Sequence, residues 1–83
     1  MSSVHTPAYQ HLLGRLRDAR REAGLTQVEL ARRIGKRQAY VSRCELGERR
    51  LDVIELLVWA DALSQPLEYF LPPRSIRLSR RAR

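Results

Sequence analysis

The chain has 83 residues, a formal net charge of +7 and a single cysteine. This length fits one domain with a small core, the lone cysteine excludes an internal disulfide, and the lack of a run of about 18 apolar residues excludes a membrane span. No basic stretch followed by an apolar one opens the sequence, so we expect no secretory signal and predict a cytoplasmic protein.

The positive charge is distributed unevenly along the chain. Residues 1–50 carry a net charge of +6, residues 51–71 carry −4 without any basic residue, and residues 72–83 carry +5. A basic half, an acidic segment and a basic tail are typical of a polyanion-binding protein with one solvated back face. Many soluble proteins are basic for other reasons, so charge alone does not decide the function.

The first predicted helix begins at Thr6-Pro7, after residues 1–5, which we expect to be disordered. A threonine hydroxyl caps a helix, and proline suits the first helical position because its missing N–H costs nothing there. Apolar residues then recur at three- and four-residue spacing until Gly24 ends the helix. These residues are Leu12, Leu13, Leu16, Ala19 and Ala23.

Two short helices joined by a tight turn follow, over Gln27–Ile34 and Gln38–Leu46. Thr26 and Glu29 form a capping box that opens the first of them. Gly35 supplies the left-handed backbone conformation that ends this helix and starts the turn. The spacing is that of a helix-turn-helix, in which the second helix is shaped to enter a DNA groove.

Small and apolar residues are placed where these two helices must pack. Ala31 lets the second helix approach the first closely. Val41 and Cys44, three residues apart, share one face and are predicted to point inward. Cys44 is therefore interpreted as a small core residue and not as a redox sensor.

A fourth helix is predicted after Gly47 and a charged loop, opened by a capping box of Asp52 and Glu55. Its apolar stripe consists of Leu51, Ile54, Leu57, Val58 and Leu63.

A short fifth helix is predicted over residues 67–71, after the break at Ser64-Gln65-Pro66. Pro72-Pro73 then ends the domain, since neither proline can continue a helix, and residues 74–83 have too little apolar content to fold by themselves. The predicted fold class is thus all-α, with five helices in residues 6–71 and an arginine-rich tail over residues 72–83.

A larger set of residues, in a fixed order along the chain, matches the pattern of a known family. The set comprises Leu16-Arg17, Arg20-Arg21, Gly24–Gln27, Leu30-Ala31, Ile34-Gly35, Val41–Arg43, Glu45, Gly47, Leu57 and Ala62-Leu63. With these residues the chain resembles, over roughly residues 10–71, the phage-repressor/Cro family of bacterial DNA-binding domains, the XRE type. The resemblance implies a lambda-repressor-like fold and a bacterial or phage transcription regulator, a repressor that binds double-stranded DNA as a homodimer.

The resemblance also implies which residues contact DNA. Gln27 matches a glutamine that binds a backbone phosphate, and free N–H groups make a helix start an anion site; the alternative is an ordinary solvated residue. Gln38 matches the glutamine that reads adenine. Arg43 either pairs with guanine or holds a phosphate. The full set of predicted DNA-binding residues is Gln27, Arg37, Gln38, Ala39, Tyr40, Ser42, Arg43 and Arg49.

Two of these residues depart from the family pattern. Arg37 replaces the usual Ser or Thr cap, which forgoes about 1 kcal/mol and opposes the helix dipole, so we interpret it as a phosphate contact. Tyr40 stands where the family often has a small polar residue. It either packs against the preceding helix or contacts a phosphate or a thymine methyl.

The remaining assignments are structural. Arg20 and Glu45 match positions at which the family holds a buried ion pair between the first and third helices. The dimer interface is expected in the region of the fourth and fifth helices, with the candidates Trp59, Leu67, Tyr69 and Phe70. For each of these four residues the alternative is a place in the core.

Other functions are weaker alternatives. No glycine-rich phosphate loop, nucleophile–base pair or metal-ligand cluster is evident, so we expect no enzyme activity, cofactor or metal. The alternative is an antitoxin-type protein that binds a partner toxin through residues 74–83 and also its own operator. Two other interpretations of residues 74–83 are a DNA-binding arm and a solubilising end. The least favoured hypothesis for the whole protein is binding to a membrane surface or to RNA by charge alone.

Overall fold

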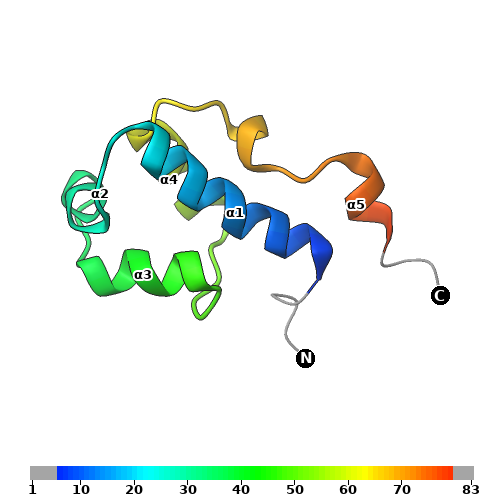
Figure 1. Cartoon of the computed structure of the whole chain (residues 1–83), viewed down its shortest axis with the longest axis horizontal. Helices are drawn as coiled ribbons and strands as arrows, with labels where there is room; N and C mark the ends of the chain where they lie inside the picture. Colours follow the sequence, from blue (N-terminus) through cyan, green and yellow to red (C-terminus); the bar gives the residue numbers. More distant parts are fainter. Residues whose placement is uncertain (1–5, 80–83) are drawn as a thin grey trace.

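The computed structural model describes residues 6–79, and these residues form helices and connecting loops without a strand. The elements are α1 (Pro7–Glu22), α2 (Gln27–Arg33), α3 (Gln38–Leu46), α4 (Val53–Ala62), the 3-10 helix η2 (Leu67–Phe70) and α5 (Arg74–Ser79). Figure 1 shows α1 running through the middle of the molecule, with α2 and α3 at one end and α5 at the other. The prediction of an all-α fold is confirmed; the disorder predicted for residues 1–5 lies outside the described residues.

Helix α1 begins for a local reason. The Thr6 hydroxyl accepts a hydrogen bond of 3.1 Å from the backbone N–H of Tyr9, and Pro7 takes the first helical position. Leu13, Leu16 and Ala19 form the buried face of the helix. The predicted start and the capping threonine are therefore confirmed.

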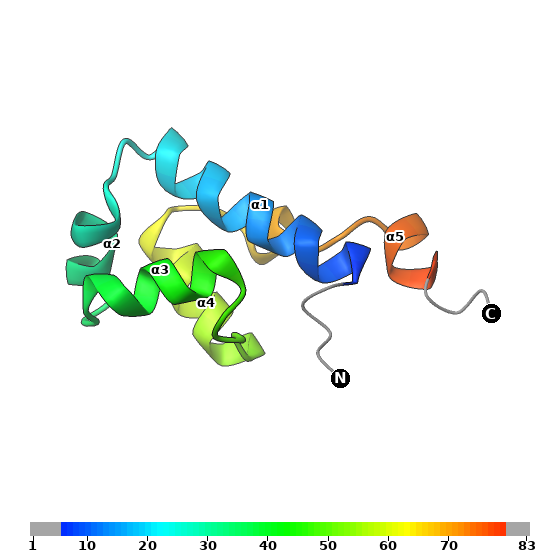
Figure 2. The ribbon, with the colours of Figure 1, turned by 60° about the horizontal axis from the view of Figure 1, so that its bottom comes forward.

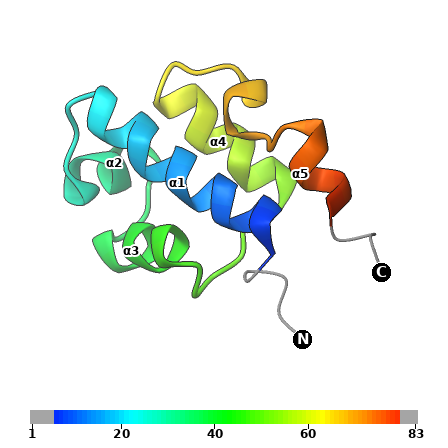
Figure 3. The ribbon, with the colours of Figure 1, turned by 45° about the vertical axis from the view of Figure 1, so that its right-hand side comes forward.

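The core lies where α1, α2, α3, α4 and η2 meet. In Figure 3, α3 lies on one side of α1 and α4 on the other, and α1 also packs against η2 and α5. The residues with an exposed fraction of 0% are Leu16, Leu30, Val41, Cys44, Trp59 and Phe70. Complete burial of two aromatic rings gives this small domain much of its apolar core.

Helix α4 turns a different face to the core than its sequence suggested. The predicted capping box is present, with Asp52 accepting from the backbone of Glu55 at 2.7 Å and Glu55 accepting from that of Asp52 at 3.0 Å. Of the predicted apolar stripe, however, Ile54, Leu57 and Val58 are exposed. The buried residues at this end of the core are Leu56, Trp59, Ala60 and Leu63.

Burial decides the role of two of the four residues for which both a dimer interface and the core were considered. Trp59 and Phe70 have an exposed fraction of 0% within one chain, so neither has surface to offer a partner. Phe70 instead packs edge-on against Tyr69, with ring centroids 5.1 Å apart. Leu67 and Tyr69 are half-buried, and Arg15 lies over the Tyr69 ring at 4.4 Å.

The segment after the two prolines is helical, which the prediction of an unstructured tail missed. The carbonyl of Pro73 accepts hydrogen bonds from the backbone N–H groups of Ile76 (3.0 Å) and Arg77 (3.1 Å). A proline has no N–H to satisfy and so is compatible with the start of a helix. Helix α5 packs against α1, where Ile76 is half-buried.

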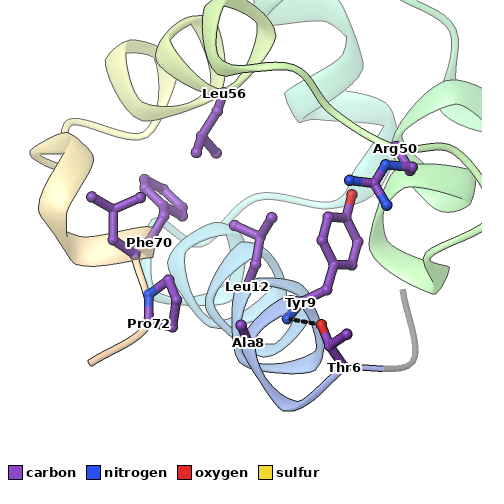
Figure 4. A pocket seen from close by; sticks show the side chains of 9 residues that line it. Thr6, Ala8, Tyr9, Leu12, Arg50, Leu56, Phe70 and Pro72 are labelled. Carbon is purple, nitrogen blue, oxygen red and sulfur yellow. Dashed lines mark hydrogen bonds between the residues drawn. The ribbon is translucent and has the colours of Figure 1, made fainter. Parts of the chain in front are cut away.

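An apolar pocket of about 270 Å³ lies between the start of α1, α4 and the segment that leads to α5. Figure 4 shows Leu12, Leu56, Phe70 and Pro72 around it, with Tyr9 near Arg50 at one edge. The Tyr9 hydroxyl accepts a 3.2 Å hydrogen bond from the backbone N–H at residue 51. Helix α1 thereby holds the loop that follows α3.

Candidate nucleic-acid interface

The turn between α2 and α3 is built from local signals. The Thr26 hydroxyl accepts from the backbone N–H of Glu29 at 3.1 Å, and the Glu29 carboxylate accepts from that of Thr26 at 2.8 Å. Gly35 has a φ of +70°, a conformation that side-chain-bearing residues rarely adopt. The expected capping box and left-handed turn are both present, and α2 packs against α3.

Helix α3 spans Gln38–Leu46, as the sequence predicts. Its inner face is buried through Val41, Cys44 and Glu45. Burial raises the pKa of the Cys44 thiol, which agrees with a core role for this residue.

The outer face of α3 is available for contact. Gln38, Ala39 and Arg43 are exposed and Ser42 is half-buried. In Figure 2, where the underside of Figure 1 comes forward, α3 lies in front of α4. Arg37 stands at the N-cap and makes no side-chain capping hydrogen bond, so its exposed guanidinium is not used to stabilise the helix start.

A buried ion pair connects α1 to α3. Arg20 Nε lies 2.6 Å from Glu45 Oε2, and Arg20 Nη2 lies 3.0 Å from Oε1, so the contact is bidentate. The exposed fractions of the two side chains are 11% and 2%. The hydrogen bond to Glu45 raises the pKa of Arg20, and Arg17 adds a 2.9 Å bond to the Glu45 carbonyl. The structure thus joins the two residues that the resemblance paired.

The same carboxylate orients two glutamines at the candidate interface. Gln27 Nε2 donates to Glu45 Oε1 at 3.0 Å, and Gln38 Nε2 donates to Gln27 Oε1 at 2.7 Å. Gln27 opens α2 and Gln38 opens α3. A continuous chain of hydrogen bonds therefore runs from Arg20 in α1 to Gln38 at the surface.

A basic groove lies beside the start of α3. Its lining residues are Gly35, Lys36, Arg37, Ala39, Tyr40, Arg43 and Arg49. Tyr40 is half-buried, and burial raises the pKa of its hydroxyl. Lys36 Nζ and Arg49 Cζ lie 5.2 Å and 4.9 Å from the centre of its ring. Tyr40 is therefore partly packed into the protein, and its ring also binds the cationic groups of Lys36 and Arg49 at this surface.

Arg49 is also held by α4. Its Nη2 lies 3.0 Å from Glu55 Oε2, and this hydrogen bond raises the pKa of Arg49. Lys36 was not among the predicted site residues, although it lies in the same groove. The sequence feature that could have identified Lys36 is its position four residues before Tyr40, because Lys36 lies in the turn before α3 and Tyr40 lies in the first turn of that helix.

A metal-ligand group and a membrane-spanning helix are both absent from the described part of the chain. Residues 6–79 contain no group of three or more His, Cys, Asp or Glu side chains that could hold a metal ion. None of the helices in this range combines the length and apolar character that crossing a membrane requires.

Comparison with known proteins identifies relatives along most of the chain. Residues 16–70 match the helix-turn-helix family. An XRE-family like protein from Pseudomonas syringae pv. tomato is 37% identical, over 98% of this chain and 96% of that one, with a TM-score of 0.73. No match is found among curated proteins.

Two further solved structures are similar. The restriction-modification controller protein C.AhdI from Aeromonas hydrophila is 31% identical, over 74% of this chain and 92% of that one, with a TM-score of 0.69. The hypothetical transcription factor NHTF from Neisseria is 30% identical, over 83% of this chain and 79% of that one, with a TM-score of 0.71. The family match runs from within α1 to the end of η2.

Proposed function

The chain belongs to the XRE-type helix-turn-helix family of DNA-binding transcription regulators, and from that premise we propose that it is a repressor that binds a specific duplex sequence as a homodimer. Two copies present two α3 helices to successive major grooves, which requires half-sites about ten base pairs apart. Repression follows from occupancy, because a dimer bound over a promoter excludes other proteins from the same DNA.

The hydrogen-bond chain from Arg20 to Gln38 carries this proposal. An amide NH₂ has two donor hydrogens. The Gln27 amide donates one hydrogen to Glu45, and its second hydrogen is left to donate to a phosphate. Gln27 stands at a helix start, where the helix dipole favours an anion. Gln38 uses one on Gln27, and its remaining hydrogen and its oxygen match N7 and N6 of adenine.

Cations around α3 supply the contacts to the DNA backbone. We assign phosphate contacts to Arg37 and Arg49, and either a phosphate or a guanine contact to Arg43. Lys36 joins them because it lies over the same tyrosine as Arg49. Ala39 and Ser42 are short, so they contribute close approach and a methyl or hydroxyl contact, and Tyr40 adds its half-buried ring.

Selection of bound duplexes from a random pool, with purified protein at about 150 mM salt, tests this proposal, because nonspecific binding is weakened there. The expected result is a near-palindrome with half-sites about ten base pairs apart. Enrichment of single half-sites alone would contradict the homodimer. Recovery of no motif would contradict sequence-specific binding.

A further inference from the structure

The pocket beside the start of α1 has apolar walls. They include Phe70, with an exposed fraction of 0%, and Leu56, with 6%. Leu12 and Pro72 also line the pocket and are half-buried. Sites for small molecules are typically concave and mostly apolar, with a few polar groups that fix the orientation of the ligand. The walls of this pocket match the apolar part of that description.

Two polar groups lie together at one edge of the pocket. Figure 4 shows the Tyr9 hydroxyl beside the Arg50 guanidinium, and the guanidinium carbon lies 5.2 Å from the centre of the Tyr9 ring. The Tyr9 hydroxyl accepts its hydrogen bond from the backbone N–H of residue 51, which leaves its own hydrogen to donate. This edge therefore offers a ligand two donors, one of which carries a positive charge.

The charge of Arg50 selects the class of ligand. No ion pair within residues 6–79 engages Arg50, since the two pairs in this range are Arg20–Glu45 and Arg49–Glu55. No acidic residue lines the pocket. A guanidinium forms two parallel hydrogen bonds with a carboxylate, and a single cation balances one negative charge. The pocket is thus complementary to a molecule with one carboxylate and an apolar body.

The volume of the pocket limits the size of that molecule. The space of about 270 Å³ equals the volume of about nine water molecules in the liquid. It lies just below the usual range of about 300–1,000 Å³ for sites that hold drug-sized ligands. A short alkyl chain fits this space, whereas a nucleotide or a polycyclic molecule does not.

We propose that this pocket binds a small monocarboxylate with an apolar chain of about eight carbons. The carboxylate pairs with Arg50 and accepts a hydrogen bond from Tyr9, and the chain lies against the apolar walls. The residues that line the pocket do not overlap with those assigned to DNA contacts. The inference therefore does not rest on the proposed function, and either one stands if the other fails.

Titration of the ¹⁵N-labelled full chain with octanoate, followed by NMR of the backbone amides, tests the site. We expect saturable shifts that are largest at residues 8–12, 50–51 and 70–71. Affinity should rise about fourfold with each methylene group from butanoate upward, because each one is removed from water, and should stop rising once the pocket is filled. Octylamine has the same chain with the opposite charge and should bind at least tenfold more weakly.

Three variants separate the charge from the apolar walls. Arg50→Gln should raise the dissociation constant of octanoate about tenfold or more, because a hydrogen bond to a charged group is lost, and should leave that of 1-octanol unchanged. Arg21→Gln removes an exposed arginine outside the pocket and should keep the wild-type affinity for octanoate. Ala8→Leu fills the space with a larger side chain and should abolish binding. Circular dichroism establishes that each variant is folded.

Three results would overturn this inference. The absence of saturable shifts at the pocket amides would exclude the site. Equal affinity for octanoate and octylamine, or an unchanged affinity of Arg50→Gln, would exclude recognition of the carboxylate. Shifts confined to the basic groove beside α3 would show that octanoate binds only as an anion on a cationic surface.

Discussion

Gln38 Nε2 donates a 2.7 Å hydrogen bond to Gln27 Oε1, and this bond joins the first residue of α3 to the first residue of α2. The Gln27 amide is in turn fixed by Glu45 at 3.0 Å. A side chain whose orientation is fixed before DNA arrives binds at a lower cost, because ordering it on binding costs free energy. The two glutamines therefore act as one unit.

Replacing Gln27 should affect both affinity and specificity. Gln27→Ala removes a proposed phosphate contact, which lowers affinity for every duplex. It also frees Gln38, which lowers discrimination at the base that we assign to Gln38. Dissociation constants for a selected and a scrambled duplex measure the two effects separately. A ratio of the two constants equal to that of the wild type would contradict the coupling of the glutamines.

Breaking the buried ion pair should lower the stability of the domain, so that any loss of DNA binding follows from unfolding. Arg20→Ala leaves the Glu45 carboxylate, 2% exposed, without its bidentate partner. The expected loss is about 3–5 kcal/mol of unfolding free energy, measured by urea denaturation. Arg21→Ala removes an exposed arginine next to it and serves as the matched control, for which we expect wild-type stability.

Arg37→Ser should move stability and affinity in opposite directions. Arg37 occupies the N-cap of α3 without a capping hydrogen bond, and serine supplies one. The variant should gain about 1 kcal/mol of stability. Loss of one phosphate contact should reduce the slope of log affinity against log salt by about 0.9. A variant that is more stable and binds DNA with an unchanged salt slope would exclude Arg37 from the interface.

The domain should lose stability in acid partly through Glu55. The hydrogen bond from Arg49, and then that from the backbone of Asp52, lowers the pKa of Glu55 below its ordinary value of 4.5. Because the folded-state pKa is the lower one, this stabilisation is complete above pH 4.5 and is lost as the pH falls through the folded-state pKa.

Glu55→Gln should therefore lower the melting temperature near neutral pH and flatten its fall in acid. Arg49→Ala should flatten it in the same way, since it removes the main cause of the pKa shift. Melting temperatures recorded between neutral pH and pH 3 test both variants. An acid slope as steep as that of the wild type in both would show that this cluster does not contribute.

Local signals explain how much of the fold was predictable. The caps at Thr6, Thr26 and Asp52 and the left-handed Gly35 depend on neighbours within a few residues, and each was identified from sequence. The orientation of α4 was not, because this helix is apolar nearly all round and its periodicity does not select a face. In the structure α4 packs against η2, a tertiary contact that the periodicity of one segment does not contain.

The contacts of the candidate site also depend mostly on tertiary structure and not on local sequence signals. The Arg20–Glu45 pair came from a family resemblance, because residues 25 positions apart carry no local signal of contact. The Gln27–Gln38 bond and the cations over Tyr40 depend on how α2 is set against α3. Helix α5 was missed because Pro73 was interpreted only as a helix breaker, whereas its carbonyl starts the next helix.

The central claim is that α3 reads DNA sequence through Gln38, and the most direct measurement compares the motifs that the wild type and Gln38→Ala select from the same random duplex pool. We predict that the variant loses its preference at one base pair of each half-site, at a cost of about 1–3 kcal/mol for that base, and keeps the remaining positions and the spacing. A motif identical to that of the wild type at every position would contradict the claim.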